Sequence, residues 1–587
     1  MRVTELQTFG VLANNLARAR ARALEFQQQV STGKLVRQPS DDPSAFNHIA
    51  LDKTSLAAIE QWRRNIVFGR TRLDLSDTVL SRTSETLARV QQLAVQFRND
   101  TNGPAERAVG AREVRQLFAQ LQQYANTDLN GQPIFTGTST HGRTTGLAIT
   151  SPVTLTDGTN DTLVITVDGV TSGTIDLTSG AETLTGDQLA ARLQSRINAD
   201  TVLTNGGKSV TVTFDGDHLV IASDSNGSQS TVAVSGGTAR GTVGLLGGSR
   251  TTGGNPFAFT ATVTSGSGNT GGVIAGQGVV VDDNAVTLDD YVIRFTSATT
   301  YDVLNVSVPV TTARGSSNVG GAAVQDAGVV DAAQLRLHNY QIQFTSTTQY
   351  SIIDQTTSTT LSSGNTYSPG QAISFDGLRV VLGNGQQGGP QTGDTFSISL
   401  TPRQVLTNQA YVSGNDISFS GIRFALTNGT GAPASGDLFS VVSGIQYQGD
   451  AGVHAIEIGP GQTVPTNVAG ERAFIGGDVD IFAYVKQLVS ALRGNDRLGI
   501  TEALGGLSPG ISQIAAIQGE VGATSNRLET NAAQLEETKG FLVQSLSETE
   551  DVDLAKAISD LTLQQYAIEA ASRTLTKVFE NSLLNYL

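Results

Sequence analysis

The sequence predicts a multidomain α+β protein in which long helices from both termini form an antiparallel helical bundle of coiled-coil type, with β-rich outer domains inserted between them. Apolar residues recur every seven positions near both ends. The middle of the chain instead alternates apolar and polar residues between glycine-rich turns. The two ends also differ in charge, with 17 Lys and Arg against 13 Asp and Glu in residues 1–135, and 8 against 15 in residues 474–587. We therefore expect helical cores at 1–138 and 471–587 and a β-rich insert at 139–470.

Composition excludes several classes of function. The 587 residues include no cysteine, which rules out disulfides, thiolate metal sites and cysteine nucleophiles. The five histidines are scattered, so histidine-rich metal centres are not expected. Residues 136–473 carry 13 Lys and Arg against 25 Asp and Glu, and this acidic middle disfavours nucleic acid and anionic membranes as partners. No segment approaches the ~20 apolar residues of a membrane helix, and the N-terminus lacks the apolar stretch of a secretory signal peptide. We expect no cofactor and no enzymatic activity.

The first expected helix covers about the first 32 residues. Its apolar positions alternate at steps of three and four: Phe9, Leu12, Leu16, Ala19, Ala23, Phe26 and Val30. Gly33 follows, and glycine is the residue that best adopts the left-handed conformation ending many helices.

A second, longer helix is expected over 43–98. Asp42 is its N-cap and Pro43 its first helical residue, a position where proline is favoured. Six apolar residues follow at intervals of seven: Ile59, Ile66, Leu73, Leu80, Leu87 and Ala94. A third helix, about 105–125, places Val114, Leu117, Leu121 and Tyr124 on one face.

The C-terminal region repeats the pattern. One series is Leu528, Leu535 and Leu542, and another is Leu554, Leu561, Ile568 and Leu575. The acidic run 548–553 is interpreted as the N-terminus of the last helix, where the helix dipole favours negative charge. A single helix with one exposed apolar seam is only marginally stable in water. We therefore expect these seams to be covered by neighbouring subunits. The expected assembly interface consists of Phe9, Leu12, Leu16, Phe26, Val30, Leu554, Leu561, Ile568, Leu575, Leu583, Leu584 and Tyr586.

The middle region contains an internal duplication. Residues 291–301 resemble residues 340–350, and Ile-Ser-Phe-Asp-Gly-Leu-Arg at 373–379 resembles Ile-Ser-Phe-Ser-Gly-Ile-Arg at 417–423. One helix, 187–199, interrupts the strand patterns. We expect these duplicated units to project outward, and a deletion of 285–445 to leave assembly largely intact.

Three short motifs have simpler explanations than a binding site. Residues 266–271 fit G-x-G-x-x-G, but no helix pattern follows to bind a pyrophosphate, so a flexible hairpin loop is expected. The stretch 224–228 spaces its oxygens like a calcium loop but lacks the glycine and glutamate that an EF-hand requires. Arg18, Arg20 and Arg22 do not share one helix face and are interpreted as solvated flanks or partners of acidic residues.

The end regions resemble a known family. Val-Ser-Thr-Gly-Lys at 30–34, followed by Pro-Ser-Asp-Asp-Pro-Ser at 39–44, resembles the N-terminal signature shared by flagellins and flagellar hook–filament junction proteins. Asn130-Gly131 and Phe-Thr-Gly at 135–137 are similar to the end of that N-terminal region, and 522–528 and 547–553 fit the C-terminal region. The last residues, Asn-Ser-Leu-Leu-Asn-Tyr-Leu at 581–587, resemble the junction proteins more than filament flagellins.

The resemblance implies a structural role in the bacterial flagellum. It implies subunits exported unfolded through the flagellar secretion channel, terminal helices that assemble into a ring, contacts with a neighbouring hook-associated protein and with flagellin, and an export chaperone. A filament flagellin is the alternative. A glycan-binding surface adhesin is disfavoured, because it would need an aromatic platform and the single tryptophan, Trp62, lies on the second expected helix.

Overall fold

The computed structural model describes residues 2–584 except 100, 139–141, 147–148, 216–217, 226–229, 246–250, 253–255, 277 and 478. Contacts divide the chain into two compact units. Unit 1 comprises Met1–Arg70, Ile456–Val464 and Thr524–Leu587, and unit 2 comprises Thr71–Ala455 and Pro465–Ala523. This division differs from the limits expected at 138 and 471, because part of the helical sequence at each end packs with the β structure.

Long helices form both ends of the described chain. Their bounds are α1 Arg2–Thr32, α2 Pro43–Arg98, α3 Pro104–Ala125, α6 Ile481–Gly494, α7 Arg497–Glu550 and α8 Leu554–Leu584. The expected range of α2 is confirmed, and Asp42 caps it by accepting the Ser44 and Ala45 N–H groups at 2.9 and 3.0 Å. All six period-seven residues of α2 are buried. Gly33 ends α1 in the left-handed region at φ +69°.

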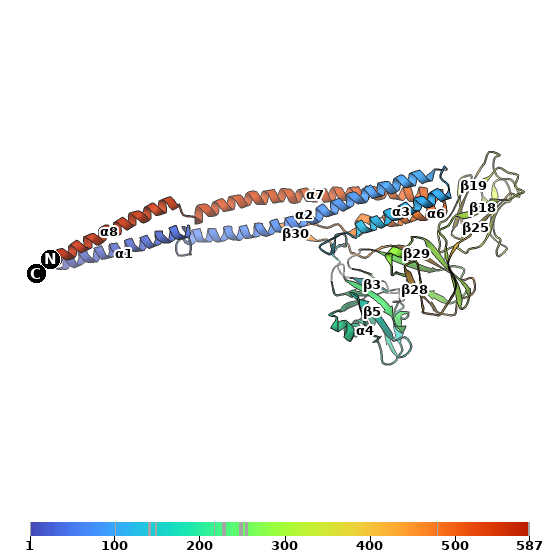
Figure 1. Cartoon of the computed structure of the whole chain (residues 1–587), viewed down its shortest axis with the longest axis horizontal. Coiled ribbons are helices and arrows are strands. Elements are labelled where there is room, and N and C mark those ends of the chain that lie inside the picture. Colours follow the sequence, from blue (N-terminus) through green and yellow to red (C-terminus); the bar gives the residue numbers. More distant parts are fainter. Residues whose placement is uncertain are drawn as a thin grey trace. The chain divides into compact units, whose positions relative to one another are not determined.

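Within unit 1, α1 packs beside α8 (Figure 1). The acidic run does not form one helix N-terminus as expected. Glu550 is the last residue of α7, and Asp553 alone caps α8 by accepting the Ala555 and Lys556 N–H groups. The acidic run 548–553 therefore spans the break between α7 and α8. At this break the Val552 N–H donates to the Gly33 carbonyl at 3.0 Å instead of to a carbonyl of its own helix.

In unit 2, aromatic side chains join α3 and α6 to the β structure. Phe118 of α3 stacks on Phe259 at 6.0 Å between ring centroids and meets the edge of Phe482 of α6 at 5.6 Å. Phe257 lies 4.9 Å from Phe474, which belongs to a single π-helical turn at Glu471–Ile475. Val114 and Leu121 are buried as expected, whereas Leu117 and Tyr124 are only half-buried.

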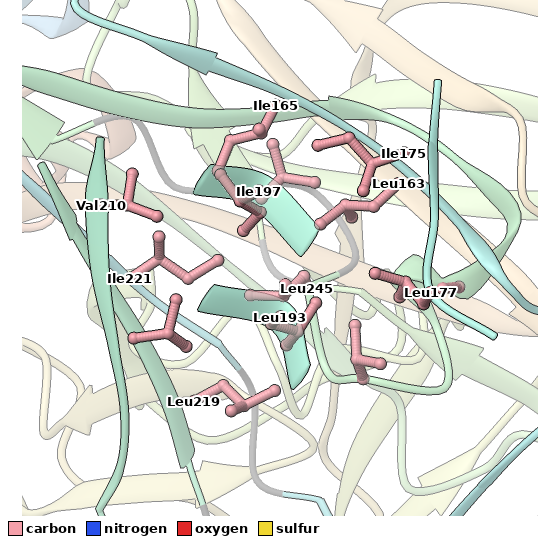
Figure 2. Packing of buried hydrophobic residues seen from close by; sticks show 14 of the residues in the cluster. Leu163, Ile165, Ile175, Leu177, Leu193, Ile197, Val210, Leu219, Ile221 and Leu245 are labelled. Carbon is pink, nitrogen blue, oxygen red and sulfur yellow. The ribbon is translucent and has the colours of Figure 1, made fainter. Parts of the chain in front are cut away.

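The first β domain (residues 142–252) packs α4 against three small sheets, and the core residues labelled in Figure 2 are all apolar. The helix expected at 187–199 is α4, whose N-cap Thr185 and Gln188 form a reciprocal capping box. Its elements are β3 Arg143–Thr145, β4 Val153–Leu155, β5 Thr162–Val167, β6 Val170–Thr171, β7 Ile175–Asp176, β8 Glu182–Leu184, α4 Gly186–Asn198, α5 Thr201–Asn205, β9 Val210–Asp215, β10 His218–Ser223, β11 Thr231–Gly236 and β12 Thr251–Thr252.

Two further β bodies correspond to the duplicated sequences. Repeat A (256–306 and 402–447) contains β13 Phe257–Ser265, β14 Val273–Ala275, β15 Gly278–Val280, β16 Asp290–Ser297, β17 Thr300–Asn305, β26 Arg403–Ala410, β27 Asp416–Phe419, β28 Ile422–Asn428 and β29 Leu438–Tyr447. Repeat B (310–400) contains β18 Val310–Arg314, β19 Ala323–Val329, β20 Tyr340–Phe344, β21 Gln349–Asp354, β22 Thr359–Thr366, β23 Ala372–Phe375, β24 Leu378–Gly383 and β25 Thr395–Leu400. Two short hairpins complete the strands: β1 Asp128–Leu129 with β2 Gln132–Pro133, and β30 Ala455–Gly459 with β31 Gln462–Pro465.

Several strand pairings of repeat A recur in repeat B. β16 pairs with β17 and β29 as β20 pairs with β21 and β25, and β27 pairs with β28 as β23 pairs with β24. Repeat B lies in sequence between β17 and β26 of repeat A. A deletion of 285–445 would therefore remove most of β29, which pairs with β13 along its whole length, so those limits do not delete a separable domain.

The G-x-G-x-x-G segment connects β13 to β14 and is tied down rather than flexible. Asp437 accepts the Thr270 N–H at 2.8 Å and the Gly271 N–H at 3.1 Å. A Cβ at Gly271 would lie 2.4 Å from Asp437 Oδ2, so the glycine is required by this close approach. Repeat B uses the same arrangement, with Gly320 and Asp394 in the equivalent places and the same 2.4 Å approach. Of the calcium-like stretch, 226–228 lie outside the described residues.

Candidate assembly interface

The residues expected to form the assembly interface lie in unit 1, and most of those described face the partner helix of the same chain. On α1, Leu12, Leu16, Phe26 and Val30 are half-buried, and on α8, Leu561, Ile568 and Leu575 are half-buried. Leu554, the first residue of α8, is 49% exposed. The side chains of Phe9, Leu583 and Leu584, and the whole of Tyr586, lie outside the described residues.

A second set of large apolar residues in unit 1 is exposed in the single chain. On α8, Leu563 and Tyr566 are 66% and 67% exposed, although α8 also contains the half-buried Leu561 and Ile568. Residues two or five positions from a seam position fall on another helix face, which explains the difference. Apart from Leu554, sequence reasoning missed this set because it followed the heptad. The members in unit 1 are Val11, Leu24, Leu35, Leu51, Val67, Phe68, Phe541, Val543, Leu554, Ile558, Leu563 and Tyr566.

These residues concentrate exposed apolar surface in unit 1. In the described part of the chain, the twelve are more than half of the 22 large apolar side chains that are exposed, yet unit 1 holds only about a quarter of the residues. Contiguous exposed apolar surface marks sites where proteins bind one another. Unit 1 is therefore the candidate interface.

A charged cluster joins the break between α1 and α2 to the break between α7 and α8. Glu550 Oε1 pairs with Lys34 and lies 2.7 Å from Lys53 Nζ, and the Glu550 side chain is only 7% exposed. The Leu35 N–H donates to the Glu550 carbonyl at 2.7 Å. We call Lys34, Lys53 and Glu550 with these backbone bonds the Glu550 clasp.

Burial of Glu550 acts to raise its pKa, but the hydrogen bonds and positive charges of Lys34 and Lys53 outweigh it, and the pKa is lowered from its usual value. Further ion pairs connect α2 to α7 in unit 1. Lys539 Nζ lies 2.5 Å from Glu60 Oε1, and Arg63 lies 3.0 Å from Glu536 Oε2. The opposite charges of the two chain ends thus meet within one chain.

One acidic cluster outside unit 1 has the composition of a metal site. The carboxylates of Asp157, Asp161 and Asp176 have oxygens within 4.8 Å of one another. Asp161 already accepts the Gly158 N–H at 2.8 Å, a bond that lowers its pKa. These contacts serve the loop itself. Among the described helices, none is long and apolar enough to cross a bilayer.

Comparison with known proteins matches both ends of the chain. Residues 7–140 match the bacterial flagellin N-terminal helical region, and residues 504–587 match the flagellin C-terminal helical region. Flagellar hook-associated protein 3 of Salmonella typhimurium is 29% identical over 141 residues, which is 24% of this chain and 44% of that protein. The protein of the same name from Escherichia coli is 32% identical over 126 residues, 21% of this chain and 40% of that protein.

Flagellin of Listeria monocytogenes is also similar, at 26% identity over 159 residues, 26% of this chain and 54% of that protein. The chain thus aligns with less than half the length of the two hook-associated relatives. A crystal structure of FlgL from Xanthomonas campestris is 16% identical and covers 84% of this chain and 99% of its own, at a TM-score of 0.28. A TM-score this low does not define a common arrangement of domains. The two ends of the chain are thus similar to the terminal helical regions of bacterial flagellins.

Proposed function

We propose that the protein is a structural subunit of the bacterial flagellum that assembles into the junction between hook and filament, as the name hook-associated protein 3 of two of its relatives suggests. The observation that carries the proposal is unit 1. It is built from the flagellin-type ends, and it holds most of the exposed large apolar side chains in the described part of the chain. No catalytic activity is part of this role.

Assembly through unit 1 has a physical basis. Each large apolar side chain that becomes fully buried contributes about 1.5–3 kcal/mol, so a few of the twelve per contact suffice to hold neighbouring subunits together. We infer partners of two kinds: further copies of this chain arranged in a ring, and the adjoining hook-associated protein and flagellin. We further infer export through the flagellar channel, with a chaperone that covers the C-terminal apolar surface before assembly.

A filament flagellin is the second candidate, because flagellins are also among the relatives. The two roles differ in copy number, since a filament contains thousands of subunits and a junction about one ring. Quantitative mass spectrometry of purified flagella separates them. A ratio of this chain to the hook subunit well below one supports the junction, and a large excess of this chain supports the filament.

Deletion of the gene tests the junction role directly. We expect intact hooks without filaments, and flagellin released into the medium, because the filament would have nothing to attach to. Plasmid-borne full-length protein should restore filaments. Hooks that still carry filaments in the deletion strain, or filaments lost without release of flagellin, would contradict the proposal.

A further inference from the structure

A cavity of about 510 Å³ in unit 2 is lined by four arginines. Arg112 and Arg115 come from α3, Arg403 is the first residue of β26, and Arg493 lies on the last turn of α6. Segments far apart in sequence therefore bring their cations to one place. The remaining lining residues are small or polar: Ala108, Thr287, Asp289, Asn305, Ser307, Val308 and Pro309.

The positive charge of this cavity is largely uncompensated. Asp289 is the single carboxylate among the lining residues, and it is used by two neighbours. It pairs with Arg493, and its Oδ2 accepts the Asn305 side-chain amide at 2.8 Å. Within the part of the chain that the structure describes, Arg112, Arg115 and Arg403 have no acidic partner at ion-pair distance.

Arg115 and Arg493 are close enough to repel each other. Burial of Arg493, together with the positive charge of Arg115, lowers the pKa of the Arg493 guanidinium. The Arg493 side chain is only 18% exposed, so water screens this repulsion less than at the surface. Arg112 and Arg403 are exposed at the rim and Arg115 is half-buried, so the cavity is open to a ligand from solvent. Like charges that line one cavity favour a bound counter-ion.

We propose that this cavity binds an oxyanion, either free phosphate or a carboxylate supplied by a neighbouring subunit. Guanidinium groups donate paired N–H bonds whose geometry matches the oxygens of phosphate and carboxylate. Arg115 and Arg493 supply donors from the helices, and Arg403 supplies them from the strand. The Ser307 hydroxyl also lines the cavity; its oxygen accepts the Asp290 N–H at 2.9 Å, which leaves the hydroxyl hydrogen to donate.

Calorimetric titration of the full chain with inorganic phosphate tests the site, with sodium chloride at equal ionic strength as the control for screening. We expect binding to the wild-type protein beyond the chloride control. The variant with Arg115→Gln and Arg403→Gln should bind at least about tenfold more weakly, since each lost charged hydrogen bond is worth about 1.5 kcal/mol or more. Arg493 is left in place, because its removal would leave Asp289 buried without a cation.

The matched control is Arg196→Gln, which removes an exposed arginine of α4 that does not line the cavity. It should bind phosphate like the wild type, and circular dichroism should show all variants folded. No binding beyond chloride, or equal binding by the double variant, would overturn the proposal.

Phosphate binding by the assembled protein distinguishes the two sources of the oxyanion. This measurement rests on the proposed function, because it requires that the chain assembles. If assemblies of this chain still bind phosphate, the free ion is the ligand. If assembly abolishes phosphate binding, a carboxylate of a neighbouring subunit occupies the cavity. The titration of the unassembled chain decides whether the site exists even if the junction role is wrong.

Discussion

Glu550 shows how a single buried charge can hold two helix breaks together. Its carboxylate contacts Lys34 and Lys53, and its backbone carbonyl accepts the Leu35 N–H. Both lysine side chains are nearly half exposed, so the attraction is partly screened. The Glu550 carboxylate itself is shielded from water. Replacing Glu550 should therefore weaken the clasp more than replacing either lysine.

Glu550→Gln should loosen the clasp at neutral pH. We expect a loss of about 1–2 kcal/mol of local stability, because a charge-assisted hydrogen bond becomes a neutral one. Since the folded-state pKa of Glu550 is lowered, its contribution is complete above the ordinary glutamate value of 4.5 and is lost as the pH falls through the lowered pKa. Hydrogen exchange over 33–56 and 545–556 should therefore differ between variant and wild type at pH 7 and converge at an acid pH below the lowered pKa.

The control for this prediction is Glu548→Gln, which changes an exposed carboxylate two residues away. It should leave exchange unchanged at both pH values. An equal effect of the two substitutions would mean that general charge on this segment, rather than the clasp, sets its stability.

The outward apolar residues lead to a second prediction at the residue scale. Leu563→Ser with Tyr566→Ser should reduce assembly at least tenfold while helix content stays unchanged, because these side chains are about two-thirds exposed in the single chain. Sedimentation measures assembly, and circular dichroism measures helix content. Val319→Ser, which changes a side chain 75% exposed in repeat B, should assemble normally. Normal assembly of the α8 variant would exclude this face as a contact.

At the scale of elements, the pairs of long helices differ in how well they are packed. Leu80 and Leu87 of α2 are fully buried, whereas Leu561 and Ile568 of α8 are half-buried against α1. A two-helix pair with one apolar seam buries too little surface to be firmly stable by itself. We therefore expect the α1–α8 pair to be the least stable of the described helical elements.

Hydrogen exchange on the unassembled chain checks this expectation. Amides of α1 and α8 should exchange faster than those of residues 71–98 of α2, and they should become protected when the protein assembles. Slow exchange in α1 and α8 of a proven monomer would contradict the idea.

Leu561→Ala with Ile568→Ala tests the seam between α1 and α8. Full burial would make each truncation cost about 2–5 kcal/mol, and half-burial places the loss at the lower end or below. Because these residues contact the same chain, we expect loss of helix content as well as of assembly, unlike the variant in which Leu563 and Tyr566 are replaced. Lost assembly with unchanged helix content would instead place Leu561 and Ile568 in a contact between subunits.

At the scale of the whole molecule, repeat B is the separable part. Val310 and Leu400, its first and last residues, are paired across β18 and β25, so the flanking chain ends are close together. Repeat B is held to the helices of unit 2 by Arg379, which lies 2.7 Å from oxygens of both Asp496 and Glu502. Asp326 of repeat B accepts the Arg497 and Leu498 N–H groups at the start of α7.

Deletion of 310–400 should therefore leave a folded protein that still assembles. We expect a modest loss of stability, of the order of 1–3 kcal/mol, because the Arg379 pairs and the Asp326 cap are lost, while Asp496 and the N–H groups at the start of α7 remain and must be satisfied by water. Thermal unfolding and sedimentation measure the two properties. The deletion of 285–445 provides the contrast and should not fold, because it leaves β13 without β29. Failure of the shorter deletion to assemble would assign repeat B a direct role.

The sequence by itself determined the helices and the duplication. The apolar period of seven, the Asp42-Pro43 start and Gly33 are local signals, and α1, α2 and α8 occur where these signals place them. The paired motifs at 373–379 and 417–423 likewise predicted two β bodies, because the same turn and strand pattern produces the same pairing.

Only the tertiary structure decided which surfaces those helices keep free. The heptad identified Leu561 and Ile568 as apolar, but an apolar seam looks the same in sequence whether it meets the same chain or another one. The structure turns that seam toward α1 and leaves Leu563 and Tyr566 exposed. The arginine cavity could not be predicted from the sequence either, because its residues come from distant segments. Arg115, Arg403 and Arg493 lie on three segments far apart in sequence, and only long-range packing of α3 and α6 on repeat A brings their charges together.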